Sequence, residues 1–127
     1  MDVNRIQREL TEAQRIFSSV QLYPTSDGKV YAKAALQTIQ NKTYVLSVRF
    51  TDNYPNEMPR VFVEAPAITN TNTPHTYQTG HICYLHPSMW NPGTHNLSFV
   101  IARAAKWLSK FEVWKAKGRW PGASLKH

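Results

Sequence analysis

Cysteine is nearly absent from the sequence: its 127 residues include only Cys83, so no internal disulfide can form. Long apolar runs are absent as well. No stretch approaches the roughly 18–20 residues that span a bilayer, and the N-terminal region has no secretory signal. We therefore expect a cytoplasmic protein with no membrane partner. In a reducing compartment a single thiol is either a small buried side chain or a reactive group, and its neighbours decide which.

Acidic residues are also scarce, since 8 Asp and Glu stand against 15 Lys and Arg and the net charge is +7. From residue 103 onward, seven Lys and Arg face one acid, Glu112. Such a region can attract acidic proteins or nucleic acid. The simpler interpretation is a helix face exposed to solvent. The basic residues do not alternate with stacking aromatics in an extended pattern, so a nucleic-acid partner is disfavoured.

The length and the apolar pattern indicate one α+β domain over residues 1–127. Apolar residues recur every three or four positions across residues 3–17, which predicts an amphipathic helix with Asp2 as its N-cap. Alternating apolar and polar residues predict four strands, separated by turns, at residues 20–23, 30–37, 43–50 and 60–64. The expected sheet is a four-stranded antiparallel meander, with helices covering one of its faces.

Between residues 65 and 96 the pattern gives way to Pro, Thr, Asn, His and Gly. This loop is far longer than the roughly 12–15 residues of an ordinary structureless connection, which indicates a functional loop. It holds Cys83 and four of the five histidines. Helical spacing resumes at Leu97, with Asn96 or Thr94 as its N-cap, and predicts C-terminal helices.

Two segments resemble ubiquitin-conjugating enzymes. Residues 54–61, Tyr-Pro-Asn-Glu-Met-Pro-Arg-Val, resemble the proline-bracketed link between the third and fourth strands of that family. Residues 80–85, Gly-His-Ile-Cys-Tyr-Leu, with Trp90-Asn91-Pro92 and a helix after them, resemble its active-site stretch. Together with the order of the elements, the resemblance covers residues 3–112 and implies the ubiquitin-conjugating (UBC) fold, with the long loop as the active-site loop.

The chain departs from the common family pattern in ways that point to one branch. Conjugating enzymes usually carry His-Pro-Asn, with the asparagine eight residues before the cysteine, and here that position is His75 in Thr73-Pro74-His75. The interval from Cys83 to Trp90 is about one residue shorter than in eukaryotic members. These features and the tryptophan-rich ending resemble a compact bacterial branch, found beside cyclic-nucleotide synthases in the anti-phage signalling operons called CBASS.

The resemblance implies a transferase that forms a thioester on Cys83 with the C-terminus of a protein and passes it to an acceptor. The protein partner is either a ubiquitin-like modifier, received from an activating enzyme, or a cyclic-nucleotide synthase, and the sequence does not separate the two. His75 falls at the position that stabilises the oxyanion in the family, and an imidazole can also act as a base. No cofactor or metal is expected, because the histidine spacings match no familiar zinc motif.

The chemistry also sets requirements for the surroundings of Cys83. The thiol must lie exposed in a shallow groove, with its pKa moderated by local donors or positive charge. If residues 80–83 are extended, His81 and Cys83 point the same way, which predicts an imidazole beside the sulfur. His86 and His95 are expected to be loop or capping residues.

Two other functions remain open. A non-catalytic binding module of the same fold is favoured by the missing asparagine and disfavoured by the retained cysteine. A cysteine hydrolase is disfavoured because such enzymes place the cysteine at a helix start, whereas the predicted helix begins about fourteen residues after Cys83.

Overall fold

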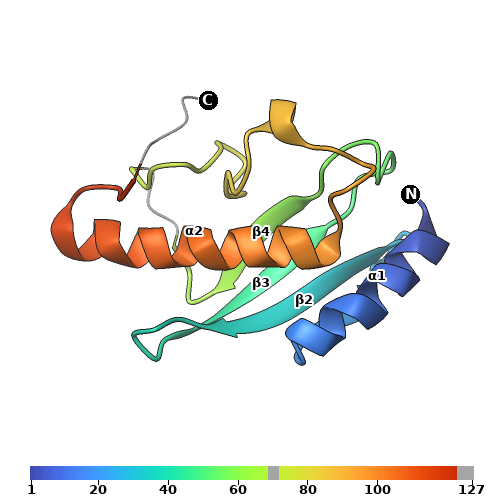
Figure 1. The fold of residues 1–127 in the computed structure, drawn as a ribbon, viewed down its shortest axis with the longest axis horizontal. Helices are drawn as coiled ribbons and strands as arrows, with labels where there is room; N and C mark the ends of the chain where they lie inside the picture. Colours follow the sequence, from blue (N-terminus) through green and yellow to red (C-terminus); the bar gives the residue numbers. More distant parts are fainter. Residues whose placement is uncertain (69–71, 123–127) are drawn as a thin grey trace.

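A computed structural model describes residues 1–68 and 72–122. The elements follow one another in the order α1 (Val3–Ile16), β1 (Gln21–Pro24), β2 (Val30–Gln37), β3 (Thr43–Arg49), β4 (Arg60–Ala65), a short 3-10 helix η1 (Pro87–Met89) and α2 (Leu97–Lys117). The four strands form one antiparallel sheet in sequential order (Figure 1). The predicted α+β order of helix, four-stranded antiparallel meander, long loop and helix is therefore confirmed.

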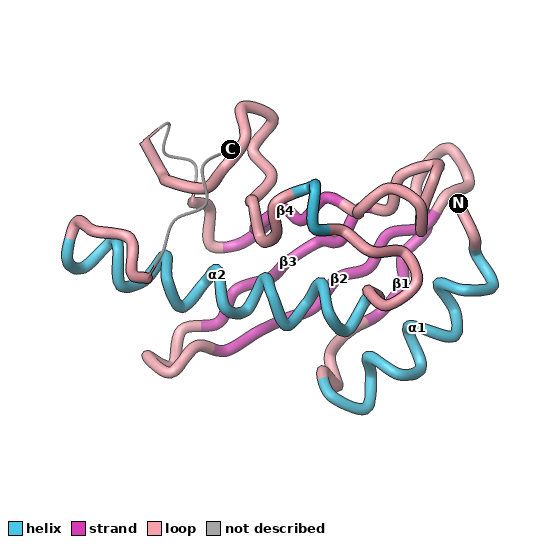
Figure 2. The backbone as a smooth tube through the Cα atoms, turned by 45° about the horizontal axis from the view of Figure 1, so that its top comes forward, coloured by secondary structure: helices cyan, strands magenta, loops and turns pink. Residues whose placement is uncertain are grey.

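Both α-helices cover the same face of the sheet (Figure 2). Period-two burial along the strands produces that face, because alternate residues of β2 are buried and the residues between them are not. The core lies between this face and the apolar sides of the helices, where Ile6 of α1 and Leu108 of α2 are fully buried. In the described part of the chain, no helix is long and apolar enough to cross a bilayer.

Side-chain caps fix the start of each helix. The Asp2 carboxylate accepts a hydrogen bond from the N–H of Arg5, and the Asn96 side chain accepts one from the N–H of Phe99, which satisfies donors that the first turn leaves unpaired. The helix α2 runs without a break to Lys117 and ends where Gly118 adopts a left-handed conformation with φ 75°. In the described residues, which end at 122, α2 is one helix where C-terminal helices were expected, because no glycine or proline interrupts residues 97–117. The last five residues, 123–127, lie outside the described residues.

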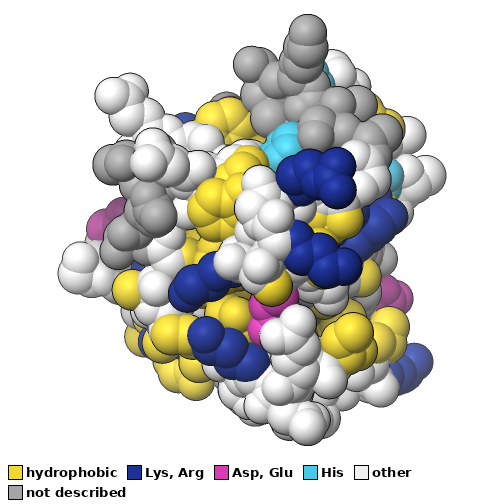
Figure 3. All heavy atoms as spheres, turned by 90° about the vertical axis from the view of Figure 1, so that its left-hand side faces the viewer, with side chains coloured by type: hydrophobic (Ala, Val, Ile, Leu, Met, Phe, Trp, Pro, Cys, Tyr) yellow, Lys and Arg dark blue, Asp and Glu magenta, His cyan; other side chains and the backbone are white. Residues whose placement is uncertain are grey.

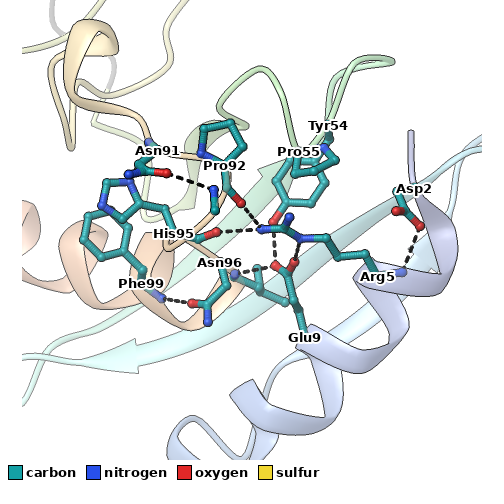
Figure 4. Close-up of polar contacts among 12 residues, drawn as sticks. Asp2, Arg5, Glu9, Tyr54, Pro55, Asn91, Pro92, His95, Asn96 and Phe99 are labelled. Carbon is teal, nitrogen blue, oxygen red and sulfur yellow. Dashed lines mark hydrogen bonds and ion pairs between the residues drawn. The ribbon is translucent and has the colours of Figure 1, made fainter.

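A partly buried ion pair ties α1 to the end of the long loop that precedes α2 (Figure 4). The Glu9 carboxylate pairs with the Arg5 guanidinium at 2.5 Å and accepts hydrogen bonds from the Tyr54 hydroxyl and the Leu97 N–H. The same guanidinium donates to the main-chain carbonyl groups of residues 92 and 95, at 2.7 and 2.9 Å. These bonds satisfy backbone groups that a surface loop leaves to solvent, so the loop enters α2 in a fixed position.

Candidate functional site

A tight turn over residues 77–81 positions the cysteine. The N–H of Tyr77 donates to the carbonyl of His81, and the N–H of Gly80 donates to the carbonyl of Tyr77. Gly80 has φ 96°, a conformation that residues with a Cβ rarely adopt. Beyond the turn, the N–H of Ile82 donates to the carbonyl of Val61 in β4, which places the next residue, Cys83, beside the sheet.

The Cys83 thiol is buried, with 7% of the residue exposed. The Tyr77 hydroxyl donates to Sγ at 3.4 Å, and Sγ lies 3.6 Å from the carbonyl oxygen of Leu85, to which the thiol can donate. Burial raises the pKa of the thiol, and the Tyr77 hydrogen bond, the backbone at Leu85 and the charge of Arg103 oppose that rise. The expectation of an exposed thiol was wrong, because the residues beside it, Ile82, Tyr84 and Leu85, belong to the core.

The imidazole of His81 packs on the ring of Tyr77. The two ring centroids lie 4.3 Å apart at 19°, and a hydrogen bond joins Nδ1 to the hydroxyl of Thr79. Burial lowers the pKa of His81, and the positive charge of Arg60 lowers it further. The Tyr77 hydroxyl lies at hydrogen-bond distance from the sulfur, and the imidazole of His81 stacks on the ring of the same tyrosine.

The structure brings His75 and Cys83 together through the backbone. The His75 carbonyl accepts a hydrogen bond from the Cys83 N–H at 2.8 Å and another from the Trp107 indole at 3.1 Å. His75 has φ 54°, in the left-handed region that asparagine and histidine tolerate better than most residues. Its ring packs on Trp120, with centroids 4.7 Å apart. The carbonyl thus joins the cysteine segment to α2.

His75 and Cys83 also line one small pocket, about 80 Å³ in volume. The rest of its wall is aromatic, apolar and basic: Tyr84, Leu85, His86, Arg103, Lys106, Trp107, Lys110 and Trp120. Lys and Arg side chains also gather on the end of the molecule where α2 finishes (Figure 3). The sequence pattern did not single out Tyr77 or the basic residues of this wall as site residues, although the excess of positive charge after residue 103 was visible.

The other loop residues hold the loop in place, as expected. His86 caps η1, since its Nδ1 accepts a hydrogen bond from the N–H of Ser88 at 3.2 Å. His95 Nδ1 accepts one from the N–H of Asn91 at 3.0 Å. The Trp90 indole donates to the carbonyl of Pro55 at 2.8 Å and so fastens the loop to the link before β4.

Proteins similar to this chain in sequence include ones named as ubiquitin-conjugating enzymes. The chain is 34% identical over 104 residues to ubiquitin-conjugating enzyme 15 of Arabidopsis thaliana, an alignment that covers 70% of this chain and 57% of that protein. It is 34% identical over 114 residues to the probable ubiquitin-conjugating enzyme E2 16 of the same plant, covering 78% and 63%. The chain therefore spans about three fifths of the length of these relatives.

Solved structures share the fold. The ubiquitin-conjugating enzyme E2 of Plasmodium falciparum superposes with a TM-score of 0.63 at 23% identity, over 84% of this chain and 96% of that one. The Plasmodium vivax enzyme gives 0.58 at 27% identity, over 83% and 99%. A Vps23 UEV, solved in complex with ubiquitin, gives 0.61 at 16% identity, over 84% and 82%.

Residues 9–127 match the family described as "Type II CBASS E2 protein", which is nearly the whole chain. The UBC-like architecture and the conjugating enzymes among its relatives agree with that match. The chain belongs to the type II CBASS E2 family, a bacterial branch of the UBC-like proteins.

Proposed function

We propose that the chain, as a single UBC-like domain over residues 1–127, is a cytoplasmic ubiquitin-conjugating-like transferase in anti-phage defence. It carries the C-terminus of a protein as a thioester on Cys83 and passes it to an acceptor. The protein carried is a ubiquitin-like modifier, received from an activating enzyme, or a cyclic-nucleotide synthase. The observation that carries the proposal is the position of the one thiol, which shares a pocket with His75 and accepts a hydrogen bond from Tyr77.

Two acyl transfers make up the reaction. In loading, the Cys83 thiolate attacks the carbonyl carbon of the incoming thioester, a tetrahedral intermediate forms, and the donor leaves as a thiolate. In transfer, an acceptor amine attacks the new thioester, its proton passes to a base, and Cys83 leaves as a thiolate. Both steps therefore need stabilisation of a thiolate and of an oxyanion.

The residues near Cys83 offer groups for these tasks. The Tyr77 hydroxyl can keep its hydrogen bond to Sγ when the sulfur is ionised, and it remains protonated because burial raises the pKa of Tyr77 to about 12. His75 lines the pocket and is our candidate for the oxyanion donor or the base. His81 acts through Tyr77, because its stacked ring holds the hydroxyl at the sulfur.

A non-catalytic binding module is the second candidate. The observation in its favour is the buried thiol, whose pKa lies above the ordinary value, since an inert cysteine is commonly buried in this way. The Vps23 UEV, which shares the fold, forms a complex with ubiquitin. Under this function the pocket would hold a partner and Cys83 would take no part.

Intact mass spectrometry of the non-reduced protein tests the proposal. The wild type is co-expressed with its neighbouring genes and compared with Cys83→Ala and with Cys83→Lys, whose amine can trap the acyl group as a stable amide. A reductant-labile adduct on the wild type that is absent from Cys83→Ala supports thioester transfer, and its mass identifies the carried protein. If an active activating enzyme produces no adduct and the thiol resists alkylation, the binding module is the better account.

A further inference from the structure

The wall of the Cys83 pocket contributed by α2 includes a row of positive charges beside Trp107. Arg103, Lys106 and Lys110 follow one another at spacings of three and four residues, so they lie on one side of the helix, and all three line the pocket. Arg103 is the member nearest the cysteine, because its Nε donates to the carbonyl of Tyr84 at 3.0 Å and its charge lowers the pKa of Cys83.

These charges lack a counter-charge within the part of the chain that the structure describes. The ion pairs found there involve Arg5, Lys29 and Arg49, and none reaches the row. Glu112, the acid on the same helix, is buried and accepts hydrogen bonds from Thr38 and Tyr44 instead. Mutual repulsion is evident at Lys110, whose pKa is lowered by burial and by the charges of its two neighbours in the row.

The geometry points to an acidic C-terminal segment as the ligand of this row. We propose that the protein carried on Cys83 has Asp or Glu residues within the last few positions before its C-terminal residue, and that Lys106 and Lys110 bind them. This inference rests on the proposed function and names the class of substrate that the site selects.

The length of this row of basic residues determines where the acidic residues of the bound peptide should lie. Seven residues of α-helix separate Arg103 from Lys110, which is about 10 Å at 1.5 Å per residue. An extended peptide covers that distance in about three residues. With the terminal carbonyl at Sγ and the peptide running along α2, the acids therefore fall about two to five positions before the C-terminal residue.

The size of the pocket favours a chain terminus over a nucleotide. Its volume is about 80 Å³, well below the ~300–1,000 Å³ of typical small-molecule sites. A carboxylate side chain fits such a space and can pair with an ammonium group on its rim.

Peptide thioesters test the inference. Two synthetic peptides share a sequence and a C-terminal glycyl thioester, and differ only in Asp and Glu or Asn and Gln at the third and fourth positions from the end. Their rates of acylation of Cys83 are measured by intact mass for the wild type and for Lys106→Gln/Lys110→Gln. The control is Arg8→Gln/Arg15→Gln, which removes two charges from exposed positions of α1.

We expect the acidic peptide to acylate the wild type about tenfold faster than the neutral one, as two partly exposed ion pairs would give. The preference should fall to about twofold or less in Lys106→Gln/Lys110→Gln and persist in the α1 control. Equal rates for the two peptides on the wild type, or a preference that survives the loss of both lysines, would overturn the inference while leaving the proposed function intact.

A binding assay tests this inference separately from the proposed acyl transfer on Cys83. Fluorescence anisotropy of the free-acid peptides is measured with Cys83→Ser, so that no covalent step contributes. If neither thioester acylates Cys83, the proposed function fails. In that case, tighter binding of the acidic free-acid peptide that depends on Lys106 and Lys110 still supports the pocket as a site for acidic peptides. Binding of an oligothymidylate of equal charge as tightly as the acidic peptide would instead identify a nucleic-acid surface and overturn the inference.

Discussion

Removal of the Tyr77 hydroxyl should change the reactivity of Cys83 in opposite directions at low and high pH. In Tyr77→Phe the ring that stacks on His81 remains and the hydrogen bond to Sγ at 3.4 Å is lost. A hydrogen bond to a charged acceptor contributes about 1.5 kcal/mol at the lower end of its range. Since that bond favours the thiolate, its loss raises the pKa of Cys83 and reduces the thiolate fraction about tenfold at neutral pH.

The intrinsic nucleophilicity of the thiolate changes the other way. Thiolates of higher pKa attack faster, with a Brønsted coefficient of about 0.4–0.5, so a tenfold weaker acid is a roughly threefold better nucleophile. At neutral pH the two effects combine to make Tyr77→Phe about threefold slower than the wild type. At a pH where both proteins are fully ionised, only the second effect remains and the variant should be about threefold faster.

Alkylation by iodoacetamide, followed by mass spectrometry from pH 6 to 11, measures both rates. In the wild type the rate should continue to rise above pH 8.5, the ordinary thiol pKa, because burial raises the pKa of Cys83. The control is Tyr23→Phe, in which the same hydroxyl is removed from an exposed residue of β1. Superimposable curves for the wild type and Tyr77→Phe, without a crossing, would refute the role assigned to the hydroxyl.

The remaining predictions concern stability. Glu9→Gln should lower the free energy of unfolding by about 2 kcal/mol or more, because it removes a buried charge that pairs with Arg5; urea unfolding measures this, and an unchanged midpoint contradicts it. Trp90→Phe should cost about 1 kcal/mol in the same assay, because the carbonyl of Pro55 loses its indole donor. His75→Asn should leave the melting temperature nearly unchanged, since asparagine tolerates φ 54°, whereas His75→Val should lower it by several degrees. Equal melting temperatures for these two variants would show that the left-handed backbone carries no strain.

The fold was predictable because burial follows the periods of the elements. The strands expected at residues 43–50 and 60–64 are found at Thr43–Arg49 and Arg60–Ala65, within a residue at each end. Alternation identifies such strands because one face meets the helices and the other does not. The number of helices in the C-terminal region was harder to predict. Periodicity shows which side of a helix is apolar, and it says little about where the helix ends.

Only part of the candidate site could be predicted. Cys83 and His75 were found by their resemblance to a family motif, and the structure brings them to one pocket. Tyr77 was missed because its contact with Sγ depends on a tight turn that no periodic pattern reveals. The burial of Cys83 was missed for a related reason: the loop is polar in sequence, yet residues 82–85 fold into the core.

A raised pKa of the Cys83 thiol slows formation of the thiolate, yet it suits a thiol that carries an acyl group. In exchange between thiols, the sulfur of lower pKa leaves faster, so an acyl group shared by two thiols accumulates on the one of higher pKa. Burial gives Cys83 that character and also keeps water from the sulfur. The opposite requirement, formation of the thiolate for attack, is met by groups that favour the charged form, namely the Tyr77 hydroxyl and the charge of Arg103. Under the proposed function, burial thus favours retention of the acyl group on Cys83, while the Tyr77 hydroxyl and the charge of Arg103 favour the thiolate that attacks the incoming thioester.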